Sequence, residues 1–438
     1  MSNSNDYSVN FNIEIDQETE IYRAIRQFSL EQASKHSNRK DARDRLANSL
    51  EKLIANLLRG NASYHIAMNK NKTDKGTRYQ CDIYKFKYRK QSLDILDELG
   101  FITQKKGSWK KQKQTVVYAN NSLLECFSDY GTADYHFKRD ELIVLRETTT
   151  TSWFQKIRSN IDYVDDDTTN LMREETELIN QMLRPLDIKY MYRYRNRGKN
   201  RNNGKGSGSS NNINIDTSIN PLVSPLRKDT SYNQIHRIFS HGSFDLGGRM
   251  YGAYWINIKK IMRQGITINN EHCSEVDFNS MHIAQMYALD GYYHSDDYDA
   301  YDIPELIAMG VSREGIKKQT QRMVNKLEPA KSFSQCSDET IKREFKGLDY
   351  ATAIQPILDK HLKIAKHFYS GIGLKLANDE ARIMIDVIKQ LIKLNIPALP
   401  LHDALIVQNR HAKKAQELMQ ERFLEFYGVP ITAGIKQL

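Results

Sequence analysis

The chain has 438 residues, 39% of them hydrophobic, so two or three domains with sizeable cores are expected. Its formal net charge of +10 favours a polyanionic partner such as nucleic acid, with solubility alone as the alternative. The 4 cysteines lie far apart, which excludes a disulfide framework and a cysteine-based zinc site. No apolar run approaches membrane-spanning length and the polar segment 1–12 lacks a signal core, so we expect a cytoplasmic protein without membrane association.

Residues 1–130 are expected to form one domain. Apolar residues recur every three or four positions over 16–34, 41–58 and 87–99, which predicts amphipathic helices. A strand-like segment from Phe101, a basic turn through Lys113 and the apolar segment 115–118 follow the third helix. This order resembles a winged-helix DNA-binding domain, in which a helix enters the major groove and a β-hairpin contacts the backbone. A generic α+β module with a solvated basic hairpin is the alternative.

Cations with aromatic neighbours are concentrated in this domain and again near residue 190. Such side chains suit phosphate contacts and base stacking. In the segment Lys189 to Arg197, cations alternate with tyrosines, and a solvated helix end is the alternative there. The predicted nucleic-acid-binding residues are Arg89, Lys105, Lys106, Lys110, Lys111, Arg193 and Arg195.

The middle of the chain separates the first domain from the second half. Residues 131–200 are expected to be a helical region, with helix over 135–185. Residues 201–215 are rich in Gly, Ser and Asn, which predicts a flexible loop. The remaining domain then spans 216–438.

Two aspartates end predicted strands in this last domain. Asp277 lies at the end of the apolar strand 274–278, and a helical pattern follows it. Asp403 lies with His402 in a tight turn between two apolar segments. Two carboxylates at strand ends can hold two Mg²⁺ ions about 3.5–4 Å apart for phosphoryl transfer. Either aspartate alone could equally be a solvated surface residue.

A basic helix and a glycine pair accompany the aspartates. In the predicted helix 312–326, Arg313 and Lys317 share one face, where they can bind a triphosphate, and Lys317 can protonate departing pyrophosphate. A solvated basic helix is the alternative. Upstream, Gly247 and Gly248 precede Arg249 and permit unusual backbone angles and close approach to a phosphate or base, unless they form an ordinary glycine turn.

Together these features resemble motifs A, B and C of family A DNA polymerases and of the related single-subunit phage RNA polymerases. The similarity rests on strand–Asp277–helix, Arg313-x-x-x-Lys317 and His402-Asp403, and it covers about residues 230–438. It implies an α+β right-hand fold: a palm of antiparallel sheet and helices carries the aspartates, short fingers carry the cations, and 131–200 is thumb-like. The chain also resembles compact polymerase-like proteins of phages and mobile elements, which often have an N-terminal DNA-binding domain.

The sequence departs from the family pattern at three positions. His282 stands where the DNA polymerases have a Glu that excludes a ribose 2′-OH and the RNA polymerases have Gly. Gln321 replaces an aromatic residue, and Ala404 replaces an acidic one. We expect His282 to lie beside the sugar and to select deoxynucleotides by steric overlap. A hydrogen bond from imidazole to the ribose, which would favour ribonucleotides, is the alternative.

The resemblance implies a template-directed nucleotidyltransferase that extends a primer as a DNA polymerase, in mobile-element replication or defence. Its partners would be template–primer DNA, or RNA, and nucleoside triphosphates. An RNA polymerase or primase and a non-catalytic DNA-binding replication initiator or regulator are the alternatives. The resemblance implies that Asp277 and Asp403 bind two Mg²⁺ ions, or Mn²⁺, and that both act in catalysis together with Lys317. The nucleotide-binding residues it implies are Arg313, Lys317, His282 and Arg249. His402 would bind the primer end.

Overall fold

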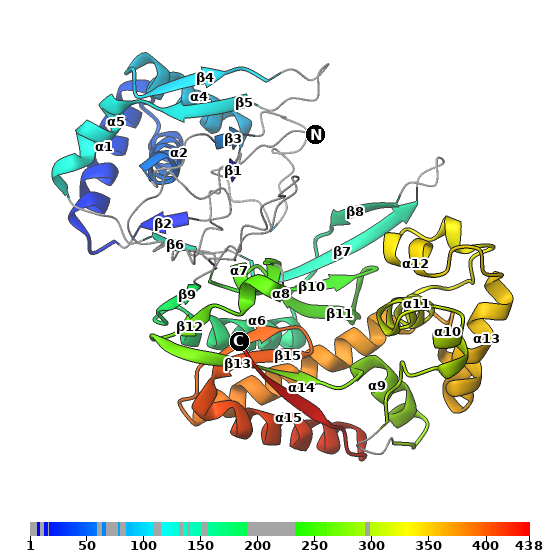
Figure 1. Ribbon diagram of the computed structural model, residues 1–438. Coiled ribbons are helices and arrows are strands. Elements are labelled where there is room, and N and C mark those ends of the chain that lie inside the picture. The colour runs from blue at the N-terminus through cyan, green and yellow to red at the C-terminus, as the bar shows by residue number, and fades with distance from the viewer. Residues whose placement is uncertain are drawn as a thin grey trace, which may run out of the picture. The chain divides into compact units, whose positions relative to one another are not determined.

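The protein combines helices with mainly antiparallel sheets in a mixed α+β structure (Figure 1). It divides into two compact units: Met1–Leu142, Arg195–Gln234 and Gly252–Tyr254 form the first, and Ile143–Tyr194, Ile235–Tyr251 and Trp255–Leu438 form the second. The predicted loop 201–215 lies outside the described part of the chain. The computed structural model describes residues 7–8, 13–15, 17–58, 64–66, 78, 85–107, 115–130, 135–137, 141–150, 156–190, 233–258, 260–293 and 298–438.

The first unit packs helices around a core of aliphatic side chains that includes Leu50, Leu53 and Leu96. The three predicted helices are present as α1, α2 and α4, because their apolar residues fall on one face. The helices are α1 (Glu20–His36), α2 (Lys40–Leu58), α4 (Phe86–Glu98) and α5 (Asn121–Phe127), followed by the 3₁₀ turn η2 (Ser128–Tyr130).

The strands of this unit form a four-stranded sheet in the order β1-β3-β5-β4 and a separate pair, β2 and β6. Helix α4, strand β4 and strand β5 follow one another as the sequence predicts, and β4 and β5 are antiparallel, with Ile102 opposite Ala119. The strands are β1 (Tyr7–Ser8), β2 (Ile13–Ile15), β3 (Tyr64–Ile66), β4 (Ile102–Lys105), β5 (Thr115–Ala119) and β6 (Tyr135–Phe137).

In its described residues, the second unit has two sheets. The larger has the order β14-β15-β13-β12-β9, with β16 paired to the other side of β13, and the smaller has the order β11-β10-β7-β8. The strands are β7 (Ile143–Thr150), β8 (Lys156–Asn160), β9 (Ile188–Tyr190), β10 (His236–Ser240), β11 (Ser243–Tyr251), β12 (Ile266–Ile268), β13 (Glu271–Phe278), β14 (Ala398–Leu401), β15 (Ala404–Gln408) and β16 (Ala433–Gln437).

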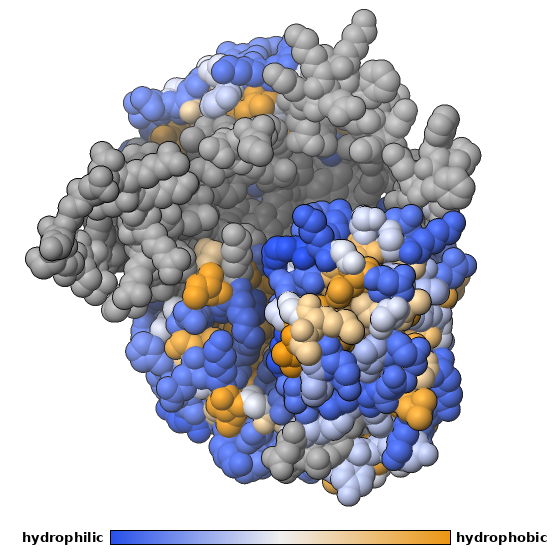
Figure 2. Space-filling model, turned by 45° about the vertical axis from the view of Figure 1, so that its right-hand side comes forward, coloured by the Kyte–Doolittle hydropathy of each residue, from blue (hydrophilic) through white to orange (hydrophobic). Residues whose placement is uncertain are grey.

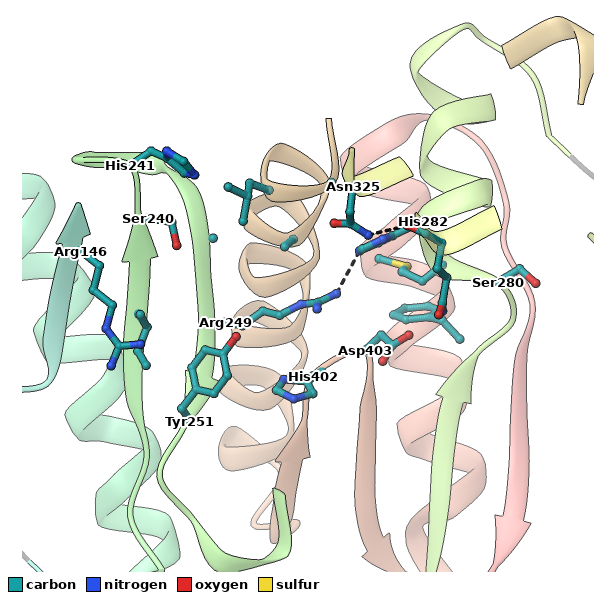
Figure 3. A pocket seen from close by; sticks show the side chains of 18 of the residues that line it. Arg146, Ser240, His241, Arg249, Tyr251, Ser280, His282, Asn325, His402 and Asp403 are labelled. Carbon is teal, nitrogen blue, oxygen red and sulfur yellow. Dashed lines mark hydrogen bonds between the residues drawn. The ribbon is translucent and has the colours of Figure 1, made fainter. Parts of the chain in front are cut away.

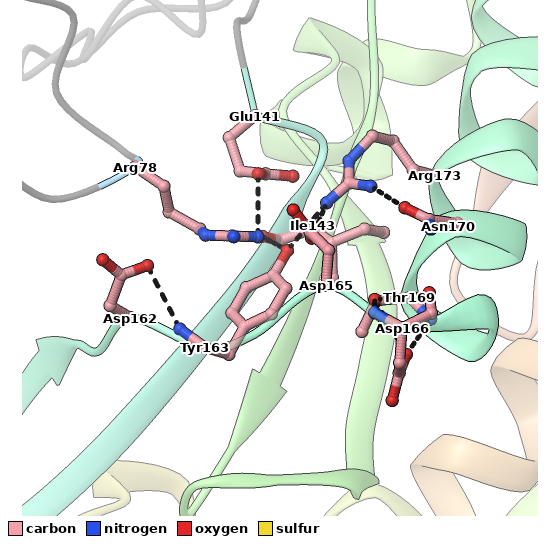
Figure 4. Close-up of polar contacts among 10 residues, drawn as sticks. All are labelled: Arg78, Glu141, Ile143, Asp162, Tyr163, Asp165, Asp166, Thr169, Asn170 and Arg173. Carbon is pink, nitrogen blue, oxygen red and sulfur yellow. Dashed lines mark hydrogen bonds and ion pairs between the residues drawn. The ribbon is translucent and has the colours of Figure 1, made fainter.

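Strands β7 and β8 correct one expectation from the sequence. Helix was predicted over 135–185, but among the described residues of this range only Asp167–Leu183 are helical, as α6. Strand β7 contains Ile, Val and three Thr residues, and β-branched side chains favour a pleated, half-buried strand over a helix. Helix α6 begins with a capping box, in which Asp166 and Thr169 satisfy each other's backbone N–H groups (Figure 4).

The long helix α14 (Gly373–Lys393) is the main buried helix of the second unit. It packs on strand β11 and on α15 (Ala412–Tyr427), and Met384, Ile388 and Leu391 on its apolar face are fully buried. Burying each such side chain stabilises the fold by about 1.5–3 kcal/mol. No helix in the described parts of the chain is long and apolar enough to cross a membrane.

The remaining helices of the second half are mostly short, and a second apolar cluster around Phe345 and Ile357 joins several of them. On the face of the molecule that Figure 2 shows, the coloured residues are largely hydrophilic with scattered hydrophobic ones among them. The elements are α7 (Tyr254–Asn257), α8 (Lys260–Arg263), α9 (Met281–Leu289), α10 (Pro304–Ala308), α11 (Arg313–Asn325), η3 (Phe333–Gln335), α12 (Glu339–Glu344), α13 (Tyr350–Lys360), η4 (Leu362–His367) and η5 (Asn409–His411).

Candidate active site

The two predicted aspartates lie at the same end of the larger sheet, Asp277 near the end of β13 and Asp403 in the turn that leads into the antiparallel neighbour β15. Asp277 on β13 lies opposite Ala404 on β15, directly after Asp403. The Phe278 N–H donates to the Asp403 carbonyl oxygen at 3.4 Å. Leu401 pairs with Ala404, so His402 and Asp403 form a two-residue turn, with His402 at φ 57°. The strand and turn positions predicted for both aspartates are therefore confirmed.

Both carboxylates line a cavity of about 600 Å³. Helix α11 contributes Lys317, Gln321 and Asn325, which are four residues apart and therefore share one helix face. Strand β11 supplies Arg249 and Tyr251, and the start of α9 supplies Ser280 and His282. Figure 3 shows Asp403, His402 and Arg249 at the cavity, with side chains arriving from strands and helices on several sides. Segments far apart in sequence thus meet around the carboxylate pair.

Burial and neighbouring negative charge raise the pKa of both carboxyl groups. Burial raises the pKa of Asp277 to about 7, and the charges of Asp403 and Glu275 add to the rise, although Lys260 and Lys317 oppose it. The pKa of Asp403 is raised by burial and by the charge of Glu380. Because a nearby cation would relieve both effects, this end of the sheet favours a bound positive charge.

The two aspartates suit a Mg²⁺ ion that also binds a substrate. Carboxylate oxygens are the ligands that Mg²⁺ prefers, and Mg²⁺ commonly binds one or two carboxylates together with substrate phosphates and water. In the described residues no group of three or more His, Cys, Asp or Glu side chains could enclose a metal. Asp277 and Asp403 therefore fit an ion that is shared with a phosphate-bearing substrate, rather than a metal cage built by protein alone.

A buried ion network occupies one wall of the cavity. Glu380 on α14 is 0% exposed and accepts two hydrogen bonds from the Arg249 guanidinium, one of them from Nε at 2.7 Å. His282 Nε2 lies 2.9 Å from Arg249 Nη2 and 3.4 Å from Glu380 Oε2. Burial acts to raise the pKa of Glu380, but its contacts with His282 and Arg249 leave that pKa lowered. The sequence analysis did not select Glu380. Its position on the apolar face of the predicted helix is the sequence feature that could have indicated a buried carboxylate with a partner.

The glycine pair before Arg249 adopts the unusual backbone angles that the sequence predicts. Gly247 and Gly248 have φ of 83° and 82°. The register between β10 and β11 shifts there, since Ile238 pairs with Arg249 and the next residue pairs with Gly247. Gly248 is thus the extra residue of a β-bulge, which bends the strand beside the site. A Cβ at Gly248 would lie 2.7 Å from a ring carbon of Phe239, so only glycine fits.

The other nucleotide-binding candidates differ in whether they line the cavity. Arg313 does not line the cavity; its guanidinium binds Asp299 at 2.6 and 2.9 Å and lies over the Tyr301 ring. Lys317, one turn later, does line the cavity. His402 also lines it, and burial lowers the pKa of its imidazole. Of the predicted arginine–lysine pair, Lys317 therefore lines the cavity and Arg313 pairs with Asp299 outside it.

The nucleic-acid-binding candidates of the first unit differ in exposure. Arg89 is only 5% exposed, because it lies on the inward face of α4, so it is poorly placed to contact a phosphate. Lys105 and Lys106 are exposed at the end of β4, and Lys105 Nζ lies 5.3 Å from the centroid of the Tyr118 ring. Lys110, Lys111, Arg193 and Arg195 lie outside the described residues.

Comparison with known proteins adds little to this geometry. No family model and no curated protein matches the sequence. Among solved structures, the chain is similar to the POL domain of Pol1 from M. smegmatis in complex with DNA primer-template and dNTP, with a TM-score of 0.31 and 13% identity. The similarity covers 48% of each chain, so this chain spans about half the length of that structure. So distant a likeness assigns neither a fold nor an activity, and the proposals below rest on the site itself.

Proposed function

We propose that the protein is a template-directed nucleotidyltransferase that extends a primer 3′-OH, most simply as a DNA polymerase. One observation carries the proposal: Asp277 near the end of β13 and Asp403 in the turn before the adjacent strand β15 line a single cavity together with Lys317. Paired carboxylates beside a cation are suited to transfer of a nucleotidyl group from a triphosphate.

Different side chains of the cavity would have different roles in this reaction. Asp277 and Asp403 would hold Mg²⁺, which supplies a lower pKa for the attacking hydroxyl and charge neutralisation for the triphosphate. Lys317 reaches the same cavity, where it binds the phosphates and donates a proton to departing pyrophosphate. Arg249 is held by Glu380, so its remaining donors point at the substrate from a fixed position. His282 and His402 contact the sugar and the primer end.

The first unit would then bind DNA and bring it to the second. The helix α4 and the β4–β5 hairpin follow in the order of a winged helix, and Lys105 and Lys106 are exposed at the hairpin. We propose contacts to the phosphate backbone for these lysines, which bind without reading sequence. In this scheme the buried Arg89 has a structural role on the inward face of α4.

The test is primer extension on a primed template, with dNTPs and NTPs supplied in separate reactions. Asp277→Asn and Asp403→Asn should each lower incorporation by at least about 10³-fold, because several kcal/mol of transition-state stabilisation is lost. Binding of the primed template should change little. Asp386→Asn, an exposed carboxylate on α14 outside the cavity, is the matched control and should extend normally.

Wild-type rates in either aspartate variant would overturn the assignment of the site. Extension with NTPs in preference to dNTPs would make the protein an RNA polymerase or primase. DNA binding without incorporation of either nucleotide set would leave the non-catalytic initiator or regulator as the function.

A further inference from the structure

A fully buried carboxylate lies behind one wall of the cavity. Glu380 on α14 is 0% exposed and is not among the residues that line the cavity. Its two partners do line it: the side chains of Arg249 on β11 and His282 on α9 are 26% and 17% exposed. Figure 3 shows these two side chains joined by a hydrogen bond at the cavity. A substrate would therefore meet Arg249 and His282, with Glu380 behind them.

The contact with Glu380 fixes the plane of the Arg249 guanidinium. Nε and Nη2 donate to the two oxygens of the carboxylate, Nε at 2.7 Å. A contact of two parallel hydrogen bonds sets the geometry of the pair as well as adding energy. The same Nη2 also lies 2.9 Å from His282 Nε2. The carboxylate therefore determines where the histidine finds its partner.

The fixed arginine in turn fixes the imidazole of His282. A guanidinium has only donors, so Nε2 must accept the hydrogen bond from Arg249, and the neutral ring carries its proton on Nδ1. Glu380 Oε2 lies farther from Nε2, at 3.4 Å, so the contact with Arg249 decides the tautomer. A proton on Nε2 would place two N–H donors face to face. Both the orientation and the tautomer of the ring follow from this network.

Folding stability alone gives little reason for a carboxylate at this position. A buried ion pair can often be replaced by apolar residues of similar volume without loss of stability. The pair does, however, hold two cavity side chains in a single arrangement. Selection of a sugar by contact needs such an arrangement, because a ring that rotates between rotamers could move away from a 2′-OH and admit a ribose.

We propose that Glu380 is a positioning residue for sugar selection, which fixes the His282 imidazole through Arg249 without touching the nucleotide. The role at the sugar rests on the proposed nucleotidyltransferase function. The fixed ring does not rest on it, so the two can be tested separately.

The first test is the ratio of kcat/KM for NTPs to that for dNTPs in primer extension. Glu380→Gln should raise this ratio by at least about fivefold, a coupling typical of residues in one hydrogen-bond network. The change should appear mainly as a lower KM for NTPs. His282→Ala/Glu380→Gln should match His282→Ala within about twofold, because Glu380 acts through the ring that His282→Ala removes.

Asp379→Asn is the matched control. Asp379 is also a buried carboxylate of α14, at 2% exposure, but its partners are Lys375 and Tyr427 and it does not line the cavity. Its replacement disturbs the same helix without touching the network at the cavity. The ratio for NTPs over dNTPs should therefore stay at the wild-type value.

The second test requires neither chemistry nor a variant that folds poorly. Nitrogen-15 NMR of histidine-labelled wild-type protein, near pH 8 in EDTA, should show His282 with a bare Nε2 and a protonated Nδ1, and the signal is assigned by its loss in His282→Gln. Glu380→Gln should populate both tautomers. If that variant misfolds, Arg249→Lys should do the same, since an ammonium keeps the charge beside Glu380 but lacks the fork.

A proton on Nε2 of His282 in the wild type would overturn the proposal. So would a sugar ratio in Glu380→Gln equal to that of Asp379→Asn, or effects of Glu380→Gln and His282→Ala that simply multiply in the double variant. In those cases normal extension by the wild type would leave the proposed function intact. No extension with either nucleotide set, with the tautomer as expected, would refute the proposed function and with it the role at the sugar, while the fixed imidazole would stand.

Discussion

Replacing Asp277 by Asn should stabilise the metal-free protein while it abolishes activity. The pKa of Asp277 rises from 3.8 to about 7 in the fold, mainly through burial and through the charge of Asp403. At about 1.4 kcal/mol per pKa unit, keeping this carboxylate ionised costs about 4 kcal/mol of folding free energy. Because the cavity admits water, which screens part of this cost, we expect about 2–4 kcal/mol to be recovered by Asp277→Asn.

The sign of the pH dependence follows from the same shift. Between pH 3.8 and about 7 the folded protein binds this proton and the unfolded chain does not, so the stability of the wild type falls as pH rises through that window and is level above it. The Asn variant lacks this fall. The two proteins should therefore have similar stability near pH 4 and differ most near pH 8.

Scanning calorimetry in EDTA measures the effect. For a unit of this size, about 2–4 kcal/mol corresponds to a rise in Tm of roughly 5–10 °C at pH 8. Asp386→Asn, which removes an exposed carboxylate, should change the Tm by less than about 2 °C. Adding Mg²⁺ should raise the wild-type Tm and leave that of Asp277→Asn nearly unchanged. An Asn variant that is no more stable than the wild type at pH 8 would show that ionised Asp277 does not destabilise the fold, which would refute the raised pKa.

Three further predictions use other parts of the chain. Gly248→Ala should destabilise the second unit by about 1–3 kcal/mol in calorimetry, because its φ is 82° and its Cβ would meet Phe239 at 2.7 Å; an unchanged Tm would refute the bulge geometry. His282→Ala should raise the ratio of kcat/KM for NTPs over dNTPs in primer extension, and an unchanged ratio would remove its role at the sugar. Lys105→Gln/Lys106→Gln should weaken duplex binding and reduce its salt slope by about 2, or about 1 per phosphate contact; a wild-type slope would argue against the hairpin contact.

Glu380 shows why part of the site could not be predicted from sequence. It lies 131 residues from Arg249 and 98 from His282 in the chain, and nothing local indicates that the three meet. In a helix pattern it appears as one more charged residue among apolar neighbours. Only the packing of α14 against β11 turns it into the buried partner of an arginine and a histidine.

The β7–β8 strand pair depends on tertiary structure in the same way. Its sequence was interpreted as helix, and even a correct strand assignment would not have said which sheet it joins. Arg313 is a third example, because its ion pair with Asp299, outside the cavity, could not be predicted from its spacing to Lys317.

The sequence by itself determined local structure, that is, individual helices, strands and turns. The periodic apolar residues of α2 and α14, the apolar strand before Asp277 and the two apolar runs around His402-Asp403 each specify an element through short-range burial patterns. Those patterns were sufficient to find both aspartates and Lys317. Tertiary structure decided which side chains share the cavity and which charges are neutralised, because those depend on contacts between segments that lie a hundred or more residues apart.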